Sequence, residues 1–244
     1  MESFLRILII LSIFLVLYCE SPSPDKYLFQ GDILLNNDFD IWERNAITDE
    51  KLRWTNGRVP YLIHPIYNDK EKELILNVMN EIENLTCLRF VERKEEEDYI
   101  GIYSDSGCWS ELGRNGGLQL LSLEASVCLS KGVIMHELMH ALGFYHEHTR
   151  YDRDEFITVH WDNIINDLMK MNFVKLPHHK MNYLEEEYDY FSVMHYTAWA
   201  FAKDRHPTLS PIRPGFTHKS LGIGQVIGKL SEVDVRKINK LYEC

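Results

Sequence analysis

The chain has 244 residues, of which 37 are acidic and 26 basic, so its formal net charge is −11. This acidic balance argues against nucleic acid or an anionic membrane surface as a partner. About 200 residues follow the N-terminal segments, which is enough for one sizeable domain or for two lobes that share a cleft.

The chain begins with an almost unbroken apolar run from Phe4 to Tyr18, with Arg6 near its start. At roughly a dozen core residues the run is too short to span a bilayer comfortably. Residues 1–19 therefore predict a secretory signal peptide that ends near Cys19, and the alternative is a signal anchor. No other apolar stretch approaches spanning length. We expect a secreted, extracellular protein with no membrane partner.

Residues 20–44 form a short, acidic and turn-rich segment without helical periodicity. Such a segment cannot bury a core of its own. It contains the run Phe29-Gln30-Gly31-Asp32 and ends at Arg44, directly before Asn45. The Arg44–Asn45 bond is a candidate processing point.

Secretion changes what the cysteines predict, because cysteines in an oxidising compartment usually pair. Apart from Cys19, which leaves with the signal peptide or lies at its edge, four cysteines remain, and sequence alone allows three pairings. These are Cys87, Cys108, Cys128 and Cys244. None has C-x-x-C spacing, which disfavours a cysteine zinc site. Asn84 begins an Asn-Leu-Thr sequon and is a candidate glycosylation site.

The segment before residue 130 has the pattern of an α+β lobe. Apolar residues at helical spacing predict a core helix from Asp69 to Leu85, which Asn68 or Asp69 can cap. Four strands are predicted around it, at Val59–Ile63, Leu88–Glu92, Tyr99–Tyr103 and Gly116–Leu123. The last strand, if it lies at a sheet edge, could bind a substrate peptide as an added strand. The alternative is an ordinary internal strand.

The stretch that carries chemistry is His136-Glu137-Leu138-Met139-His140, followed by Gly143 and His146. On a helix from Lys131 to Leu142, the four-residue step places both histidine rings on one face. Gly143 can end the helix in a left-handed conformation, so that the chain returns His146 as a third ligand. Three neutral imidazoles with an open position are a catalytic Zn²⁺ arrangement, with one ion per chain. The alternative is an amphipathic core helix that happens to carry histidines.

Glu137 follows the first ligand directly, so it can hold a metal-bound water without being a ligand itself. The full spacing, with the glycine and the third histidine, is identified as the metzincin signature. Downstream, Ser192-Val193-Met194-His195-Tyr196 resembles the Met-turn, in which Met194 forms a hydrophobic floor beneath the zinc histidines. Without the upstream signature, the alternative interpretation of this stretch is the apolar end of a strand, with Met194 as a packing residue. The phenol of Tyr196 can act as a ligand or donate a hydrogen bond to an oxyanion.

Two later segments, 150–165 and 170–187, show no clear period, and we assign the second to loops around the cleft. Leu230–Tyr242 has a partial apolar stripe, with Ser231 as its N-cap. It predicts a helix that closes the domain.

From the signature onward the chain resembles the astacin family of metzincin zinc endopeptidases. The likeness covers nearly all of residues 45–244, including the extended motif from His136 to Asp154, the Met-turn and the ending 237–244. It implies an α+β, metzincin-type zinc protease. A mixed-sheet N-terminal lobe carries the active-site helix, and an irregular C-terminal lobe carries the Met-turn and the closing helix.

Carried over residue by residue, the resemblance implies roles for five side chains. His136, His140 and His146 are the zinc ligands. Glu137 is the general base and acid, and Tyr196 is a fifth ligand that swings to stabilise the transition state.

The resemblance also implies the disulfides Cys87–Cys244 and Cys108–Cys128. Phe29–Asp32 resembles the inhibitory aspartate segment of the family, so Asp32 is expected to bind zinc in the zymogen only. Cutting the Arg44–Asn45 bond would release it. The new amine at Asn45 is then expected to be buried near Glu147.

These predictions describe a secreted zinc metalloendopeptidase that is made as a zymogen. Its expected parts are a signal peptide (1–19), an inhibitory propeptide (20–44) and an astacin-like catalytic domain (45–244). We expect a monomer that acts on extended protein or peptide substrates and does not bind nucleic acid. The competing hypothesis is a catalytically silent secreted binding protein or toxin on a protease scaffold. That protein should lack a ligand or Glu137, and none is missing here.

Overall fold

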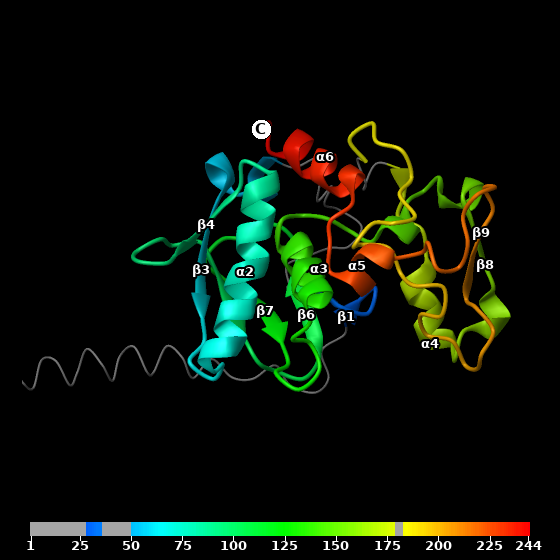
Figure 1. Cartoon of the computed structure of the whole chain (residues 1–244), viewed down its shortest axis with the longest axis horizontal. Helices are drawn as coiled ribbons and strands as arrows, with labels where there is room; N and C mark the ends of the chain where they lie inside the picture. The colour runs from blue at the N-terminus through cyan, green and yellow to red at the C-terminus, as the bar shows by residue number, and fades with distance from the viewer. Residues whose placement is uncertain (1–27, 36–49, 179–182) are drawn as a thin grey trace, which may run out of the picture.

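The computed structural model describes residues 28–35, 50–178 and 183–244 (Figure 1). The predicted signal peptide and the Arg44–Asn45 bond lie outside these residues. The first lobe contains a seven-stranded mixed sheet with helices against it, which confirms the predicted α+β class. Its strands are β1 (Leu28–Phe29), β2 (Ile33–Leu34), β3 (Arg58–Ile63), β4 (Arg89–Glu92), β5 (Tyr99–Tyr103), β6 (Cys108–Glu111) and β7 (Leu118–Leu123).

The strand order across this sheet is β1-β2-β6-β7-β5-β3-β4. Strands β3, β4, β5 and β7 are parallel to one another, whereas β6 runs antiparallel to β7. Parallel strands are normally buried on both faces, and in β5 Ile100 and Ile102 are fully buried. The strands predicted at β3, β4, β5 and β7 are confirmed: the bounds of β5 match, and the other three begin one or two residues from the predicted start.

The strand before the zinc helix does not lie at the sheet edge. β7 pairs with β5 through Leu118–Ser122 on one side and with β6 through Leu121–Leu123 on the other, so it is an internal strand. The prediction that this strand could bind a substrate peptide is therefore wrong, and the internal-strand alternative holds. The strand beyond it is β6, which no sequence pattern indicated. Residues 28–35, here called the leader segment, place β2 parallel to β6.

Helix α2 (Asp69–Leu85) begins and ends where its periodicity predicts. The Asn68 side chain accepts hydrogen bonds from two backbone N–H groups of the first turn, and Glu71 completes a capping box. Residues three or four positions apart on a helix share a face, and here that face is buried. It consists of Ile75, Val78, Met79 and Ile82.

Helix α3 (Lys131–Ala141) carries the first two histidines and is buried on almost every side. It contacts α2 on one flank and α5 (Ile223–Ile227) on another, and it covers β6 and β7 (Figure 1). The Ser130 side chain caps its first turn. The chain leaves the helix at Gly143, where φ is 104°, a conformation that side chains with a Cβ rarely adopt. The predicted glycine stop is confirmed.

The C-terminal lobe is largely irregular, as predicted, and has a small aromatic-rich core of its own. It contains one antiparallel strand pair that the sequence did not indicate, β8 (Ile157–Val159) with β9 (Leu209–Pro211). The other short elements in the described ranges are α4 (Asp167–Lys170) and the 3₁₀ helices η1 (Glu50–Leu52), η2 (Thr55–Gly57), η3 (Glu147–Thr149), η4 (Arg153–Glu155), η5 (Trp161–Asn163) and η6 (Met171–Phe173).

Helix α6 (Glu232–Leu241) closes the chain, with Ser231 as the predicted N-cap. It does not belong to the C-terminal lobe alone, because Ile238 and Leu241 pack into the core of the first lobe. A disulfide joins Cys244, just after α6, to Cys87, just after α2, and a second joins Cys108 to Cys128. These are the pairs that the family resemblance implies. Among the described residues, no helix is long and apolar enough to cross a membrane.

Candidate active site

Three imidazole rings converge on one point beside the leader segment. His136 and His140 come from one face of α3, and His146 follows the glycine exit. The Nε2 atom of His136 lies 3.1 Å from that of His140 and 3.2 Å from that of His146. Ligands about 2.0–2.1 Å from a tetrahedral zinc ion lie about 3.3 Å from one another. The three nitrogens therefore have the spacing of zinc ligands.

The outer ring nitrogens determine which tautomer each imidazole adopts. The Nδ1 atoms of His136 and His140 lie 2.8 and 2.7 Å from backbone carbonyl oxygens, and Nδ1 of His146 lies 2.9 Å from Oε1 of Gln30. Because these oxygens only accept, each Nδ1 carries the hydrogen and each Nε2 lone pair faces the centre. Converging lone pairs repel one another unless a cation lies between them, so this donor set fits a zinc ion.

Burial also keeps two of these imidazoles, His140 and His146, in the form that a metal needs. It lowers the pKa of His140, and it lowers the pKa of His146 to about 4, although the carboxylate of Asp32 acts in the opposite direction. Zinc binds neutral imidazole. These two rings are therefore neutral, and able to bind a metal ion, at neutral pH.

Asp32 of the leader segment lies on the remaining side of the centre. Its Oδ2 is 3.2 Å from Nε2 of both His136 and His146, and its Oδ1 is 3.4 Å from Nε2 of His140. Burial alone would raise the pKa of Asp32, but the surrounding imidazoles hold it well below its usual range. The four side chains together are a group, within the described residues, that could hold a metal ion. The leader thus supplies an anionic oxygen where a catalytic zinc site keeps a position for water.

Glu137 is buried next to the first histidine, and its Oε2 has no hydrogen-bond partner among the described residues. Burial, together with the charge of Asp32, raises the pKa of Glu137 well above its usual range. A buried carboxylate oxygen that accepts no hydrogen bond is rare in proteins and calls for an explanation. A carboxyl group with raised proton affinity can accept and return a proton near neutral pH.

Tyr196 lies against the third histidine, with ring centroids 4.8 Å apart. Its ring also stacks on that of His148, with centroids 3.9 Å apart. The hydroxyl donates a hydrogen bond to the backbone carbonyl of Gln30 in the leader segment. Burial raises the pKa of Tyr196 well above its ordinary value, so the phenol keeps its proton and remains a donor. The tyrosine is close to the centre but is bonded to the leader.

The predicted Met-turn is held in place by helix α6. Asp234, in the first turn of that helix, accepts hydrogen bonds from the Ser192 hydroxyl at 2.6 Å and from the Val193 backbone N–H at 2.9 Å. The carbonyl of Val193 in turn accepts the Nδ1–H of His136. Met194 is buried in the core of the first lobe. The closing helix therefore helps to orient the first histidine through the turn.

Glu147, expected to receive the new N-terminus, already has partners in this structure. Its carboxylate lies 2.5 Å from Nζ of Lys237 and 3.2 Å from Nη1 of Arg150. Burial alone would raise the pKa of Glu147, but these two cations lower it. This buried carboxylate is therefore already paired in the chain that still carries the leader segment. An arriving amine would have to join an existing ion-pair cluster.

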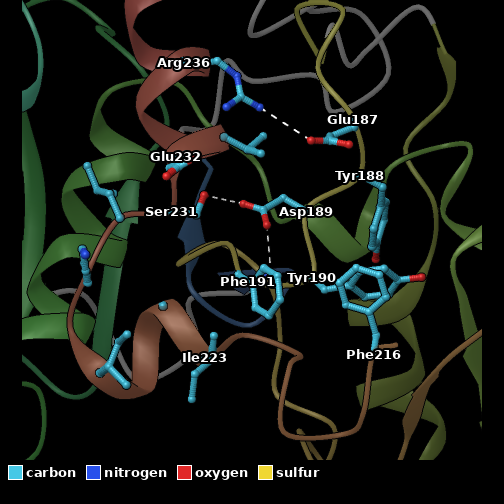
Figure 2. Close-up of a pocket in the computed structure, with 15 residues that line it drawn as sticks. Glu187, Tyr188, Asp189, Tyr190, Phe191, Phe216, Ile223, Ser231, Glu232 and Arg236 are labelled. Carbon is cyan, nitrogen blue, oxygen red and sulfur yellow. Dashed lines mark hydrogen bonds and ion pairs between the residues drawn. The ribbon is translucent and has the colours of Figure 1, made fainter. Parts of the chain in front are cut away.

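A cavity of about 550 Å³ opens beside the Met-turn, between residues 187–191, α5 and the start of α6 (Figure 2). Figure 2 shows Asp189 at its wall, with hydrogen bonds from the Ser231 hydroxyl and the Phe191 backbone N–H. Burial, with the nearby carboxylates of Asp234 and Glu147, raises the pKa of Asp189 to about 7. The hydrogen bonds oppose this shift without cancelling it.

We expect Asp189 to make the fold less stable as the pH rises from about 4 to 7. Its pKa is about 7 in the folded chain against 3.8 as an ordinary value, so the folded state binds more protons across this window. The free energy of unfolding of the parent should therefore fall between pH 5 and pH 8. In Asp189→Asn the fall over the same interval should be smaller by about 1–3 kcal/mol. Urea unfolding at both pH values measures this difference. Asp162→Asn, an exposed control, should keep the parent's dependence, and an Asp189→Asn protein that also keeps it contradicts the assignment.

Sequence reasoning missed several residues of this site. Gln30 was noted only as part of a motif, although it bonds both His146 and Tyr196. Lys237 was noted only as the start of the ending that carries the resemblance, and its contact with Glu147 was not predicted, since a lysine on a helix is usually solvated. Asp234 could have been found, because an acidic residue three positions after a Ser N-cap is a capping-box pattern.

Comparison with known proteins agrees with this geometry. The family model Astacin, which describes a peptidase family, matches residues 46–243. Zinc metalloproteinase nas-4 of Caenorhabditis elegans is 42% identical over 233 residues, which cover 92% of this chain and 71% of the relative. Zinc metalloproteinase nas-8 of Steinernema carpocapsae is 44% identical over 202 residues, covering 82% of this chain and 47% of the relative.

A solved structure shares the fold as well. High choriolytic enzyme 1 of the medaka Oryzias latipes, described as a hatching enzyme zinc-protease, matches with a TM-score of 0.72 and 37% identity. The match covers 84% of this chain and 98% of that one. The chain thus spans nearly all of this structure but only about half of nas-8. The family model, the relatives and the imidazole cluster agree, and the chain belongs to the astacin family of zinc metallopeptidases.

Proposed function

We propose that this protein is a secreted zinc metalloendopeptidase, made as a zymogen, that hydrolyses internal peptide bonds of extended protein substrates. One observation carries the proposal. Three Nε2 lone pairs converge beside the buried Glu137, whose Oε2 has no partner among the described residues, and the leader segment brings Asp32 to the same point. A centre built only for structure would not need a buried carboxylate oxygen without a partner.

A zinc ion bound by the three histidines would lower the pKa of a water toward about 7 and polarise the substrate carbonyl. In this proposal Glu137 accepts the proton of the attacking water and later returns it to the leaving amine. The backbone carbonyls that accept Nδ1–H of His136 and His140 keep both rings oriented during the cycle. Once the leader has left, Tyr196 is free to turn its hydroxyl toward the developing oxyanion.

If Tyr196 has this role, Tyr196→Phe should lower kcat far more than it changes KM. The hydrogen bond would strengthen only in the transition state, and one such donor is typically worth about 3 kcal/mol, or roughly a hundredfold in rate. Steady-state kinetics on a peptide substrate measures both parameters. Tyr151→Phe, a tyrosine that no sequence or structural argument places at the centre, is the control. Unchanged kcat in Tyr196→Phe would make Tyr196 a packing residue.

The zymogen proposal assigns residues 1–19 to a signal peptide, 20–44 to an inhibitory propeptide and 45–244 to the catalytic domain. Cleavage after Arg44 would free Asn45, whose amine we place beside Glu147.

Two disulfides support an oxidising, extracellular destination. The exposed Asn84, in the last turn of α2, is accessible for glycosylation. We propose a monomer that binds neither nucleic acid nor membrane.

Removal and return of zinc test the proposed activity. A chelator should abolish proteolysis by the activated protein, and one equivalent of Zn²⁺ should restore it, because the ligand set is held by the fold. Fluorogenic peptides report the activity, and circular dichroism reports whether the fold persists without metal. Proteolysis that survives complete metal removal would refute the proposal.

A further inference from the structure

The third histidine differs from the other two in what its outer nitrogen bonds. Nδ1–H of His136 and of His140 donate to backbone carbonyls within the catalytic domain. Nδ1–H of His146 donates to the side-chain Oε1 of Gln30 at 2.9 Å, and Gln30 belongs to the leader segment. Two of the three partners are permanent, and the third can be removed.

Loss of the leader leaves Nδ1–H of His146 without its partner. Gln30 supplies the only acceptor found for this nitrogen among the described residues. Histidines that bind metal almost always donate their second N–H, which fixes the ring and raises its basicity. A buried donor that lacks an acceptor is costly. Whatever next occupies the cleft therefore gains by bringing an acceptor to this position.

The structure also shows what kind of side chain fits there. Gln30 is only 1% exposed, so its side chain is enclosed in the space that it fills. Its φ is 52°, which is uncommon for a residue other than glycine. The bonds to His146 and from the Tyr196 hydroxyl offset this backbone strain. At the next residue, a Cβ added to Gly31 would lie 3.2 Å from both Tyr196 and Phe201, so the surroundings are close on this side too.

We propose that the space filled by Gln30 is a specificity subsite of the activated enzyme for a glutamine side chain of the substrate, whose amide oxygen accepts Nδ1–H of His146. This inference rests on the proposed function and names part of its substrate class. Methionine has a similar length but only a weak acceptor. Glutamate would accept the bond, but Nε2 of Gln30 is buried and has no hydrogen-bond partner in the part of the chain that the structure describes. In a glutamate a charged oxygen would take the place of this amide nitrogen. A buried charged oxygen without a hydrogen-bond partner costs more free energy than a buried amide N–H₂ group without one.

Binding of the leader peptide gives the first test. The peptide of residues 28–35 and its Gln30→Met and Gln30→Glu versions are titrated by calorimetry into activated protein carrying Glu137→Gln, so that no peptide is cut. We expect both substitutions to raise Kd about fivefold or more. Asp32→Asn in the same peptide is the matched positive control, since it weakens a different contact. Equal Kd values for the three residues at position 30 overturn the inference.

Cleavage gives the second test. A fluorogenic peptide series carries one glutamine at each successive position around the cut bond, with a methionine series as the matched control. We expect one position at which glutamine raises kcat/KM about fivefold or more over methionine and over glutamate. Efficient cleavage without such a position overturns the subsite and leaves the proposed function intact. Absence of all cleavage refutes the proposed function, and the calorimetric test then decides the subsite alone.

Discussion

Replacing Glu137 by glutamine should leave zinc binding intact and remove nearly all proteolysis. The substitution keeps the size of the side chain and leaves all three imidazole ligands in place, but it removes the buried carboxylate that we propose takes the proton of the attacking water. General base catalysis typically contributes about 10²–10⁴ in rate. We expect kcat to fall by about that factor, with one zinc ion per chain still found by elemental analysis.

The matched control is Glu73→Gln, which neutralises an exposed carboxylate on α2. It should keep both metal content and turnover. A Glu137→Gln protein that cleaves peptides at the parent's rate would show that another group moves the proton. A Glu137→Gln protein that has lost its zinc would show instead that this residue supports the ligands.

The parts of the fold that sequence predicts well are those determined by neighbouring residues. Helix α2 has its cap, its apolar face and its end within one stretch, so its bounds match the prediction. Strand β6 has only four residues, and its place depends on pairing with β7 and with the leader segment. Whether a strand lies at the edge or in the interior of a sheet depends on how the whole sheet is assembled. The sequence pattern of β7 alone therefore could not reveal that this strand is internal.

The same distinction holds within the site. His136, Glu137, His140 and His146 lie within eleven positions, and helical geometry with one glycine exit determines how they meet. The contact of Lys237 with Glu147 spans 90 positions, and that of Gln30 with His146 spans 116. Such contacts follow from how lobes and segments pack. No local periodicity encodes them.

Replacing Asp32 by alanine should give an uncut chain with measurable proteolysis. In the structure one carboxylate oxygen lies 3.2 Å from Nε2 of His136 and of His146, and the other lies 3.4 Å from Nε2 of His140, so the carboxylate occupies the position that we assign to the attacking water. Removing the carboxylate opens that place. The β2–β6 pairing and the contacts of Gln30 remain and still obstruct the cleft. We therefore expect activity at least about tenfold above the uncut parent and below that of the cleaved protein.

Every uncut protein in this comparison should carry Arg44→Ala, so that cleavage at the Arg44–Asn45 bond cannot produce the signal, and the protein cleaved at the unaltered bond is the reference for full activity. Asp38→Ala is the matched control, because it removes one acidic charge from the same predicted propeptide and should leave the chain inactive. N-terminal sequencing after each assay confirms that the chains are uncut. If the uncut parent is already fully active, Asp32 does not block the centre and residues 20–44 are only a spacer. If Asp32→Ala stays as inactive as the parent while the cleaved protein is active, the block comes from the pairing of the leader with β6.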